Sequence, residues 1–309
     1  MPDNDKRSDT SIQPAAHNLP SKTATNARSI FALPAPLRRI FDKFPLITYD
    51  ANELPERAPK TRDEHVLHVF TTEEEATRGR PSFNPGCLKW QTYLRFSGVS
   101  FRTVPSSNHA SPSGMLPFLQ PAVTSAESNN ALDPIPSNKL KKWLASQKKV
   151  KSVDETADIR YEAYASLLDN RIRKAWLYQL YLEPRNSPLV QRLYVAPCSS
   201  QPLVQKAITH QLRSAAALEL EKSAGSNVVS ALDLLNDAEE AFQALADLLG
   251  QDQWFFGQGH PSLFDASFFA YTCLILDDAF GWKHNPLEEL LSKHQNLVDH
   301  RNRIVEVYF

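Results

Sequence analysis

Cys87 is the residue whose position in the sequence best suits nucleophilic chemistry. It follows Pro85 and Gly86 and precedes LKWQTYLRF, a segment with helical spacing of apolar residues. A thiol at a helix start meets the positive end of the helix dipole, which lowers the pKa of the cysteine. No second cysteine lies two or three positions away, so dithiol redox chemistry is excluded. A single cysteine here is also commonly a buried apolar residue.

Ser82 and Ser106 could act as hydroxyl nucleophile or activator, but neither has a partner base nearby in the sequence.

The nine histidines show no spacing typical of a metal site. His65 and His68 fall on opposite faces of a predicted strand, and His294 and His300 are expected at the surface or at helix caps. The nine glycines form no loop of the kind that holds phosphates. We therefore predict no catalytic residue, no metal site and no cofactor.

Ser262 and Asp265 have the spacing of a capping box at the start of LFDASFFAYTCLI. The Ser262 hydroxyl can accept the N–H of Asp265, and the Asp265 carboxylate can accept the N–H of Ser262. The carboxylate also faces the positive end of the helix dipole. Because the helix is apolar on all sides, it must lie inside a domain. We interpret the pair as a structural cap.

Composition indicates a globular protein of about two domains, with 309 residues of which 42% are apolar. The net charge of −1 excludes a globally basic protein that binds nucleic acid. Three widely spaced cysteines favour reduced thiols in the cytosol over a disulfide framework. The uncharged apolar run at 266–276 is far shorter than the roughly 20 residues of a spanning helix. The N-terminus matches neither a secretory signal nor a transit peptide.

Three regions follow from the chain's patterning. We predict an N-terminal arm over residues 1–60, an α/β domain over 61–150 and an all-α C-terminal domain over 151–309. The arm is polar and rich in proline, so it is expected to be disordered. A short amphipathic helix is predicted at about 36–44, where the apolar residues are spaced i, i+3, i+4, i+7. This stripe could dock on the chain's own body, on a partner or on a membrane surface; it consists of Leu37, Ile40, Phe41 and Phe44.

The second region shows the order of elements found in thioredoxin-like domains. HVLHVF predicts a strand, a helix follows between Pro85 and Gly98, and SFRTV predicts a second strand parallel to the first. Pro117 then stands directly before a short third strand at 118–119, and residues 121–136 are expected to be a loop. This order resembles a thioredoxin-like fold, which implies that Pro117 is cis and shapes a pocket. A last helix is predicted at 137–147.

A run of lysines marks this last helix, and we interpret it in two ways. Usually such a run is a solvated face. It could instead meet anionic head groups, where each lysine contributes about 1 kcal/mol. The candidates on the helix are Lys139, Lys141 and Lys142.

The rest of the chain is predicted to be helical, with segments at about 152–183, 187–195, 202–222, 227–249, 263–276, 286–294 and 296–308. Ser152 and Glu155 are spaced as a second capping box. The segment at 227–249 has an apolar stripe near heptad spacing, which we expect to pack within the domain. Its members are Val228, Leu232, Leu235, Phe242, Leu245 and Leu249.

The overall plan resembles the glutathione transferase fold, and within it the metaxin family. The resemblance is carried by NPGCLKWQTYLRFSGVSFRTVPSSNHASPSGMLPFLQP, by FFGQGHPSLFDASFFAY and by HQNLVDHRNRIVEVYF, and it spans most of residues 65–309. A glutathione site would also need an acidic residue and a serine at a helix start. Glu127 and Ser128 are separated from the next helix by two prolines, and Ser137 has no acidic neighbour. This polar site is therefore expected to be degraded.

The resemblance implies a non-enzymatic peripheral subunit on the cytosolic face of the mitochondrial outer membrane. It also implies three kinds of partner: a barrel-shaped insertase, a second metaxin-like subunit, and the β-barrel precursors whose signal strand is received. Two alternatives stay open. One is a glutathione-dependent transferase that uses Cys87, and the other is the companion metaxin-like subunit of the same machinery.

Overall fold

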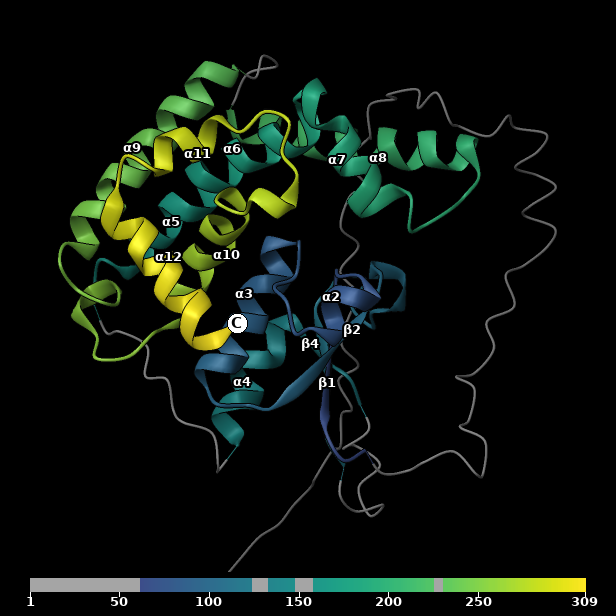
Figure 1. Cartoon of the computed structure of the whole chain (residues 1–309), viewed down its shortest axis with the longest axis horizontal. Helices are drawn as coiled ribbons and strands as arrows, with labels where there is room; N and C mark the ends of the chain where they lie inside the picture. The colour runs from purple at the N-terminus through teal and green to yellow at the C-terminus, as the bar shows by residue number, and fades with distance from the viewer. Residues whose placement is uncertain (1–61, 124–132, 148–157, 225–229) are drawn as a thin grey trace, which may run out of the picture. The chain divides into compact units, whose positions relative to one another are not determined.

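The computed structural model describes residues 62–123, 133–147, 158–224 and 230–309, which belong to one compact unit (Figure 1). The described chain has a small mixed sheet with flanking helices, followed by a mostly helical part. This confirms the predicted fold class for these residues. The predicted N-terminal arm and the capping box at Ser152 and Glu155 lie outside the described residues.

Four strands form the sheet in the order β2-β1-β3-β4. They are β1 (His65–Val69), β2 (Phe101–Pro105), β3 (Phe118–Gln120) and β4 (Ile135–Pro136). β1 and β2 are parallel, as predicted, with His65 opposite Phe101, whereas β3 is antiparallel to β1 and β4 is antiparallel to β3. The two-residue strand β4 falls where a loop was expected, because prolines mask its pattern.

Three α-helices accompany the sheet. α3 (Pro85–Phe96) begins at Asn84, whose side chain accepts the N–H of Cys87, and it ends before Gly98, which has a φ of 72°. α4 (Ser137–Ser146) buries Leu140 and Leu144 one turn apart. The sequence prediction missed α2 (Glu73–Thr77), a single acidic turn whose start is capped by the Thr72 side chain. A 3-10 turn, η1 (Asn108–Ala110), lies in the loop between β2 and β3.

The helical part contains α5 to α12 with short 3-10 and π segments between them. In order, they are α5 (Tyr161–Leu167), η3 (Leu168–Ile172), α6 (Arg173–Leu177), η4 (Tyr178–Leu182), η5 (Pro184–Asn186), α7 (Ser187–Val190), η6 (Gln191–Val195), α8 (Pro202–Ala224), α9 (Ala231–Leu249), η7 (Phe255–Gly257), α10 (Leu263–Ile275), η8 (Asp278–Phe280), α11 (Pro286–Leu291) and α12 (Gln295–Tyr308). The long helix predicted up to Pro184 is therefore α helix interrupted by the two π segments η3 and η4.

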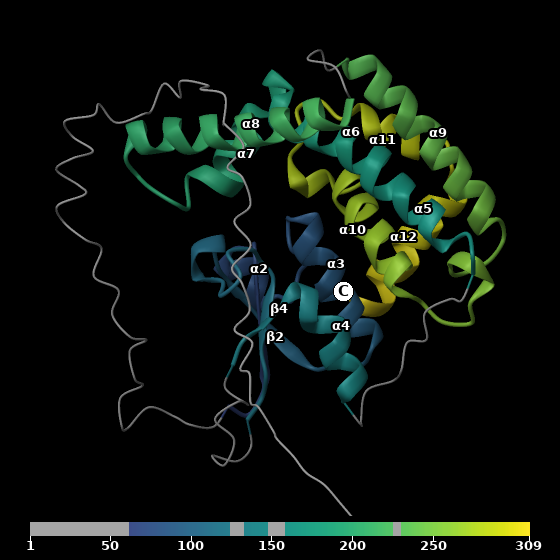
Figure 2. The same cartoon turned by 180° about the vertical axis from the view of Figure 1, so that it is seen from behind.

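α10 is the central helix of the described chain. It packs against α3 on one side and against α11 and α12 on another (Figures 1 and 2). Its buried side chains point in every direction around the helix axis, including Phe264, Phe268, Phe269 and Cys273. The prediction of an internal helix is confirmed.

The apolar stripe predicted for α9 packs only in part. Phe242, Leu245 and Leu249 are buried, and Leu235 is half-buried. Leu232, however, is 67% exposed, so its expected packing is wrong. The spacing places Leu232 on an apolar face, but spacing does not show how far the neighbouring elements extend. Val228 lies outside the described residues.

Candidate functional site

The start of α3 is built so that its polar groups are already satisfied. The Ser82 hydroxyl donates to the Phe70 carbonyl at 2.6 Å, and the Ser82 N–H donates to Gln91 Oε1 at 2.8 Å. The Asn84 carbonyl oxygen Oδ1 accepts the N–H of Cys87 at 3.1 Å. Ser82 is fully buried. Its hydroxyl proton is used inside the fold, and neither bond partner is a base that could activate it.

Cys87 is completely buried, and its thiol is a weak acid. Burial raises the pKa of Cys87 to about 12, outweighing hydrogen bonds with Phe70 and Ser82 that act to lower it. Desolvation disfavours a buried charge more strongly here than the helix start favours it. The reactive thiolate considered from the sequence is therefore not supported, and Cys87 is a buried core residue.

Aromatic side chains from the helical part close over the start of α3. The Tyr194 ring, from η6, meets the rings of Phe83, Phe70 and Tyr181 at centroid distances of 5.3, 5.5 and 6.0 Å. The Tyr194 hydroxyl donates to the Phe83 carbonyl and accepts from the Asn84 amide. Burial raises the pKa of Tyr194 well above its ordinary value. Tyr194 thus fills the space beside the helix start with a neutral ring.

Pro117 follows a cis peptide bond with Leu116 and leads directly into β3. The backbone beside it is engaged by its own loop. The Leu116 N–H donates to Asn108 Oδ1 at 3.0 Å, and the Met115 carbonyl accepts the Ser111 hydroxyl at 2.6 Å. A peptide ligand at this proline would have to displace the Asn108 side chain before it could pair with the Leu116 amide.

The polar pair expected of a glutathione site is not assembled in the described ranges. Glu127 and Ser128 lie outside them. Ser137 is the first residue of α4, and no side chain caps that helix, because Pro136 stands at the cap position. The described Ser106 donates its N–H to the Val69 carbonyl and acquires no base. His65, His68 and the other described histidines, cysteines and acids form no group of three that could hold a metal ion.

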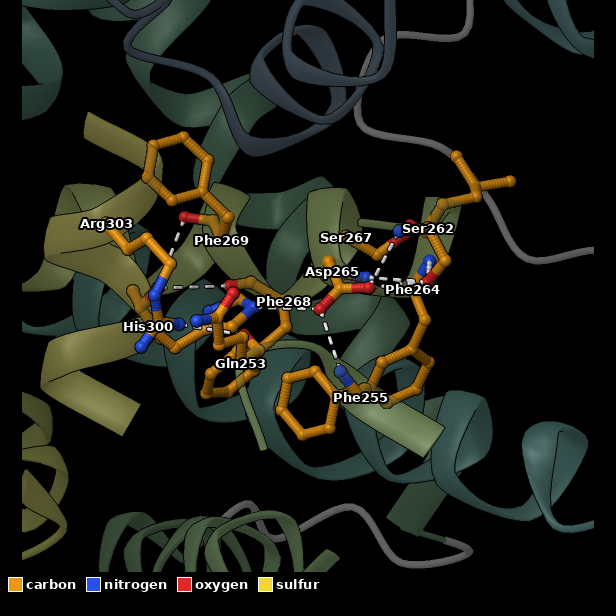
Figure 3. A network of polar contacts seen from close by, with 12 residues as sticks. Gln253, Phe255, Ser262, Phe264, Asp265, Ser267, Phe268, Phe269, His300 and Arg303 are labelled. Carbon is orange, nitrogen blue, oxygen red and sulfur yellow. Dashed lines mark hydrogen bonds and ion pairs between the residues drawn. The ribbon is translucent and has the colours of Figure 1, made fainter. Parts of the chain in front are cut away.

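Asp265 is the centre of a buried polar network at the start of α10 (Figure 3). Both halves of the capping box are present: Ser262 caps the first turn, and Asp265 Oδ2 accepts the Ser262 N–H at 2.8 Å and its hydroxyl at 2.6 Å. The second carboxylate oxygen, Oδ1, accepts the Phe255 N–H at 3.0 Å. It also lies 2.9 Å from His300 Nε2. With both oxygens occupied and no exposure to solvent, Asp265 has a structural role.

His300 was missed by the sequence prediction, which placed it at the surface or at a cap. It is fully buried among the rings of Trp254, Phe255 and Phe268 and comes from α12. The available signal was its spacing, because His300 lies three residues after buried Leu297 and four before buried Ile304. His294, in contrast, does stand at the cap position of α12.

The predicted docking residues fall into two groups. Lys139, Lys141 and Lys142 are all exposed on α4, which buries Leu140 and Leu144. The apolar stripe of the arm (Leu37, Ile40, Phe41 and Phe44) lies outside the described residues. Across the described ranges, none of the helices combines the length and the apolar character that a membrane span requires.

Two family models match this chain. The glutathione S-transferase N-terminal domain model matches residues 85–186, and the glutathione S-transferase C-terminal domain model matches residues 238–304. Among proteins, Metaxin-3 of Xenopus laevis is 28% identical over 236 residues, covering 75% of this chain and 74% of the relative. The Metaxin-1 homolog of Drosophila melanogaster is 28% identical over 255 residues, covering 79% and 72%. Over at least 75% of its length the chain is similar to these metaxins.

The chain has the glutathione-transferase-like fold that both domain models describe. Among solved structures, a glutathione S-transferase of Ceriporiopsis subvermispora in complex with glutathione has a TM-score of 0.47 at 16% identity, covering 80% of this chain and 99% of that one. Glutathione transferase GSTFuA3 of Phanerochaete chrysosporium has a TM-score of 0.45 at 12% identity, covering 77% and 98%.

Proposed function

We propose that this chain is a non-enzymatic, peripheral subunit of the mitochondrial outer-membrane sorting and assembly machinery, most like its fungal thirty-five-kilodalton metaxin-like subunit. It acts on the cytosolic face of the membrane. There it works beside a barrel-shaped insertase and a second metaxin-like subunit. It helps to receive the signal strand of β-barrel precursors during their insertion.

One observation carries the non-enzymatic part of this proposal. Where a transferase-like fold would hold a thiol ligand, polar groups at the start of α3 and beside the cis proline are engaged within the protein. Cys87 is buried with its pKa raised to about 12, Tyr194 covers the helix start, and Asn108 occupies the amide beside the cis proline. Similarity to metaxins over at least 75% of the chain supports the assembly role. The companion subunit of the same machinery is the second candidate within that family.

Affinity purification from gently solubilised mitochondria tests the assembly role. The tagged chain should recover a barrel-shaped outer-membrane protein and a second metaxin-like protein in near-constant ratio. The Cys87→Ser variant should recover the same proteins, because the thiol does no chemistry in this proposal. Recovery of the chain only as a free monomer would overturn the proposal.

Calorimetry with glutathione tests the transferase alternative. We expect no heat of binding at millimolar glutathione for the unmodified protein, because the amide of Leu116 and the start of α3 are already occupied. Saturable glutathione binding that Cys87→Ser weakens would favour the transferase instead.

A further inference from the structure

The first half of α8 carries an exposed apolar face. Leu203 is 81% exposed and Val204 is 45% exposed, while the buried residues Ala216 and Leu220 lie in the second half of the helix. Figures 1 and 2 show that α8 begins beyond the neighbouring helices and runs back toward them. Among the described elements, none packs over the first turn of α8 closely enough to bury Leu203.

The segment around this face contains no acidic residue. Residues 184–218 include neither Asp nor Glu, in a chain that has 35 of them. Two cations lie on α8, exposed Lys206 and half-buried Arg213, and within the described ranges neither forms an ion pair with a carboxylate. By contrast, Arg185 of the same segment is paired with Glu183, and Arg192 donates to the Phe280 carbonyl. The net positive charge of this segment is therefore concentrated on α8.

Helical spacing brings the apolar and basic residues together. Leu203, Lys206 and Ala207 are related as i, i+3 and i+4, so they share one face of the helix. All three are exposed. The buried residues Ala216 and Leu220 lie farther along the helix and about a third of a turn around its axis from Leu203, and α8 packs against η4 and η6. The first half of α8 thus exposes Leu203, Val204 and Ala207, with Lys206 at the edge of this face, and no described element buries them.

We infer that residues 202–213 of α8 lie on an anionic lipid surface, with Leu203 and Val204 in the head-group boundary and Lys206 and Arg213 beside phosphates. Apolar side chains flanked by cations are the pattern of helices that bind at such a boundary. A protein partner matches this face less well. Lysine is depleted in protein–protein interfaces, and a stable interface of this kind buries about 1,000 Å² or more. The inference rests on the proposed function only for the identity of the membrane.

Vesicle flotation with the full chain tests this surface. Leu203→Asp should lower partitioning into vesicles of phosphatidylcholine with anionic phospholipid by about tenfold, because it removes an inserted side chain and adds a repelled charge. Leu232→Asp is the matched control, since Leu232 is a similarly exposed leucine on α9 and is 67% exposed. The control should bind within about twofold of the unmodified protein. Both variants should keep the unfolding midpoint of the parent.

Cys198 gives a second readout at the same place. It is exposed in the turn before α8, whereas Cys87 and Cys273 are buried, so a thiol-reactive fluorophore will label Cys198 selectively. Anionic vesicles that carry a quencher on the lipid head group should quench this label. Vesicles of phosphatidylcholine alone with the same quencher should quench it much less.

Several results would overturn the inference. They are unchanged vesicle binding by Leu203→Asp, an equal loss in Leu232→Asp, equal quenching by uncharged vesicles, and no quenching at all. Unchanged binding would assign the membrane contact to another segment, such as the N-terminal arm. If Leu203→Asp instead bound vesicles normally but lost the copurifying proteins, the face would be a protein contact. Failure of the parent chain to copurify any partner would count against the proposed function. The vesicle experiment would still test the lipid contact of α8 by itself.

Discussion

At Cys87, two effects on one thiol oppose each other. Its place in the first turn of α3 favours the thiolate, while its complete burial favours the neutral thiol. The raised pKa shows that burial dominates. The sequence contains the first effect, because proline and glycine mark the helix start. It does not contain the second, because burial depends on tertiary packing, and the neighbours of this helix start include Tyr194, which bonds Asn84 from 110 residues farther along the chain.

The raised pKa of Cys87 predicts a loss of stability at alkaline pH. Below pH 9.0, the ordinary value, both folded and unfolded chains keep the proton; between pH 9.0 and about 12 only the folded chain keeps it. The free energy of unfolding should therefore fall by about 1.4 kcal/mol per pH unit for this one thiol. Urea unfolding of Cys87→Ala between pH 9 and about 11 should show a slope shallower by that amount.

Cys198→Ala is the control for this measurement, because Cys198 is exposed. Its slope should equal that of the parent. A Cys87→Ala slope as steep as the parent's would show that the Cys87 thiol does not resist ionisation in the folded protein.

On the scale of single elements, the start of α10 has the most complete set of polar contacts. The Asp265 carboxylate accepts the N–H groups of Ser262 and Phe255 and contacts His300. These three residues come from different segments of the chain. Asp265→Ala leaves these buried groups unpaired and should lower the free energy of unfolding by about 3 kcal/mol or more. Urea unfolding at neutral pH measures the change.

Asp299→Ala provides the comparison, because Asp299 is an exposed acid on α12 whose side chain accepts from the Gln295 amide of the same helix. It should change the free energy of unfolding by less than about 0.5 kcal/mol. Equal losses in the two variants would mean that the buried network adds nothing beyond an ordinary surface contact.

The elements differ in how well the sequence predicts them. α10 was predicted with its cap and its burial, because Ser262, Asp265 and an apolar run are all local signals. The π segments η3 and η4 were not, since an i, i+5 bond changes the helical phase without a distinctive residue type. α2 and β4 are one turn and two residues long, too short to show a period.

At the scale of the described chain, Arg95 links the sheet region to the C-terminal helix. Its guanidinium donates to the Tyr308 carbonyl and, at 2.8 Å, to the Gly79 carbonyl. It also lies 4.1 Å from the centre of the Phe309 ring. Burial lowers the pKa of Arg95. These contacts join segments more than two hundred residues apart, which no local pattern could have indicated.

Arg95→Ala should lower the free energy of unfolding by about 2 kcal/mol, because it removes hydrogen bonds from a charged donor and a ring contact. Arg102→Ala is the matched variant, since Arg102 forms an exposed pair with Glu64 at 2.8 Å. Its loss should be below about 1 kcal/mol. Chemical unfolding of both variants decides the matter, and a smaller loss in Arg95→Ala than in Arg102→Ala would contradict the assigned role.

The packing of Phe309 has a practical consequence for how the protein can be handled. Its ring stacks on Phe269 of the central helix at 5.7 Å and receives the Arg95 guanidinium. An epitope or fluorescent protein fused directly after Phe309 would compete for the space of its ring and weaken its contacts with Phe269 and Arg95. A reporter attached at Phe309 therefore needs a long glycine-serine spacer.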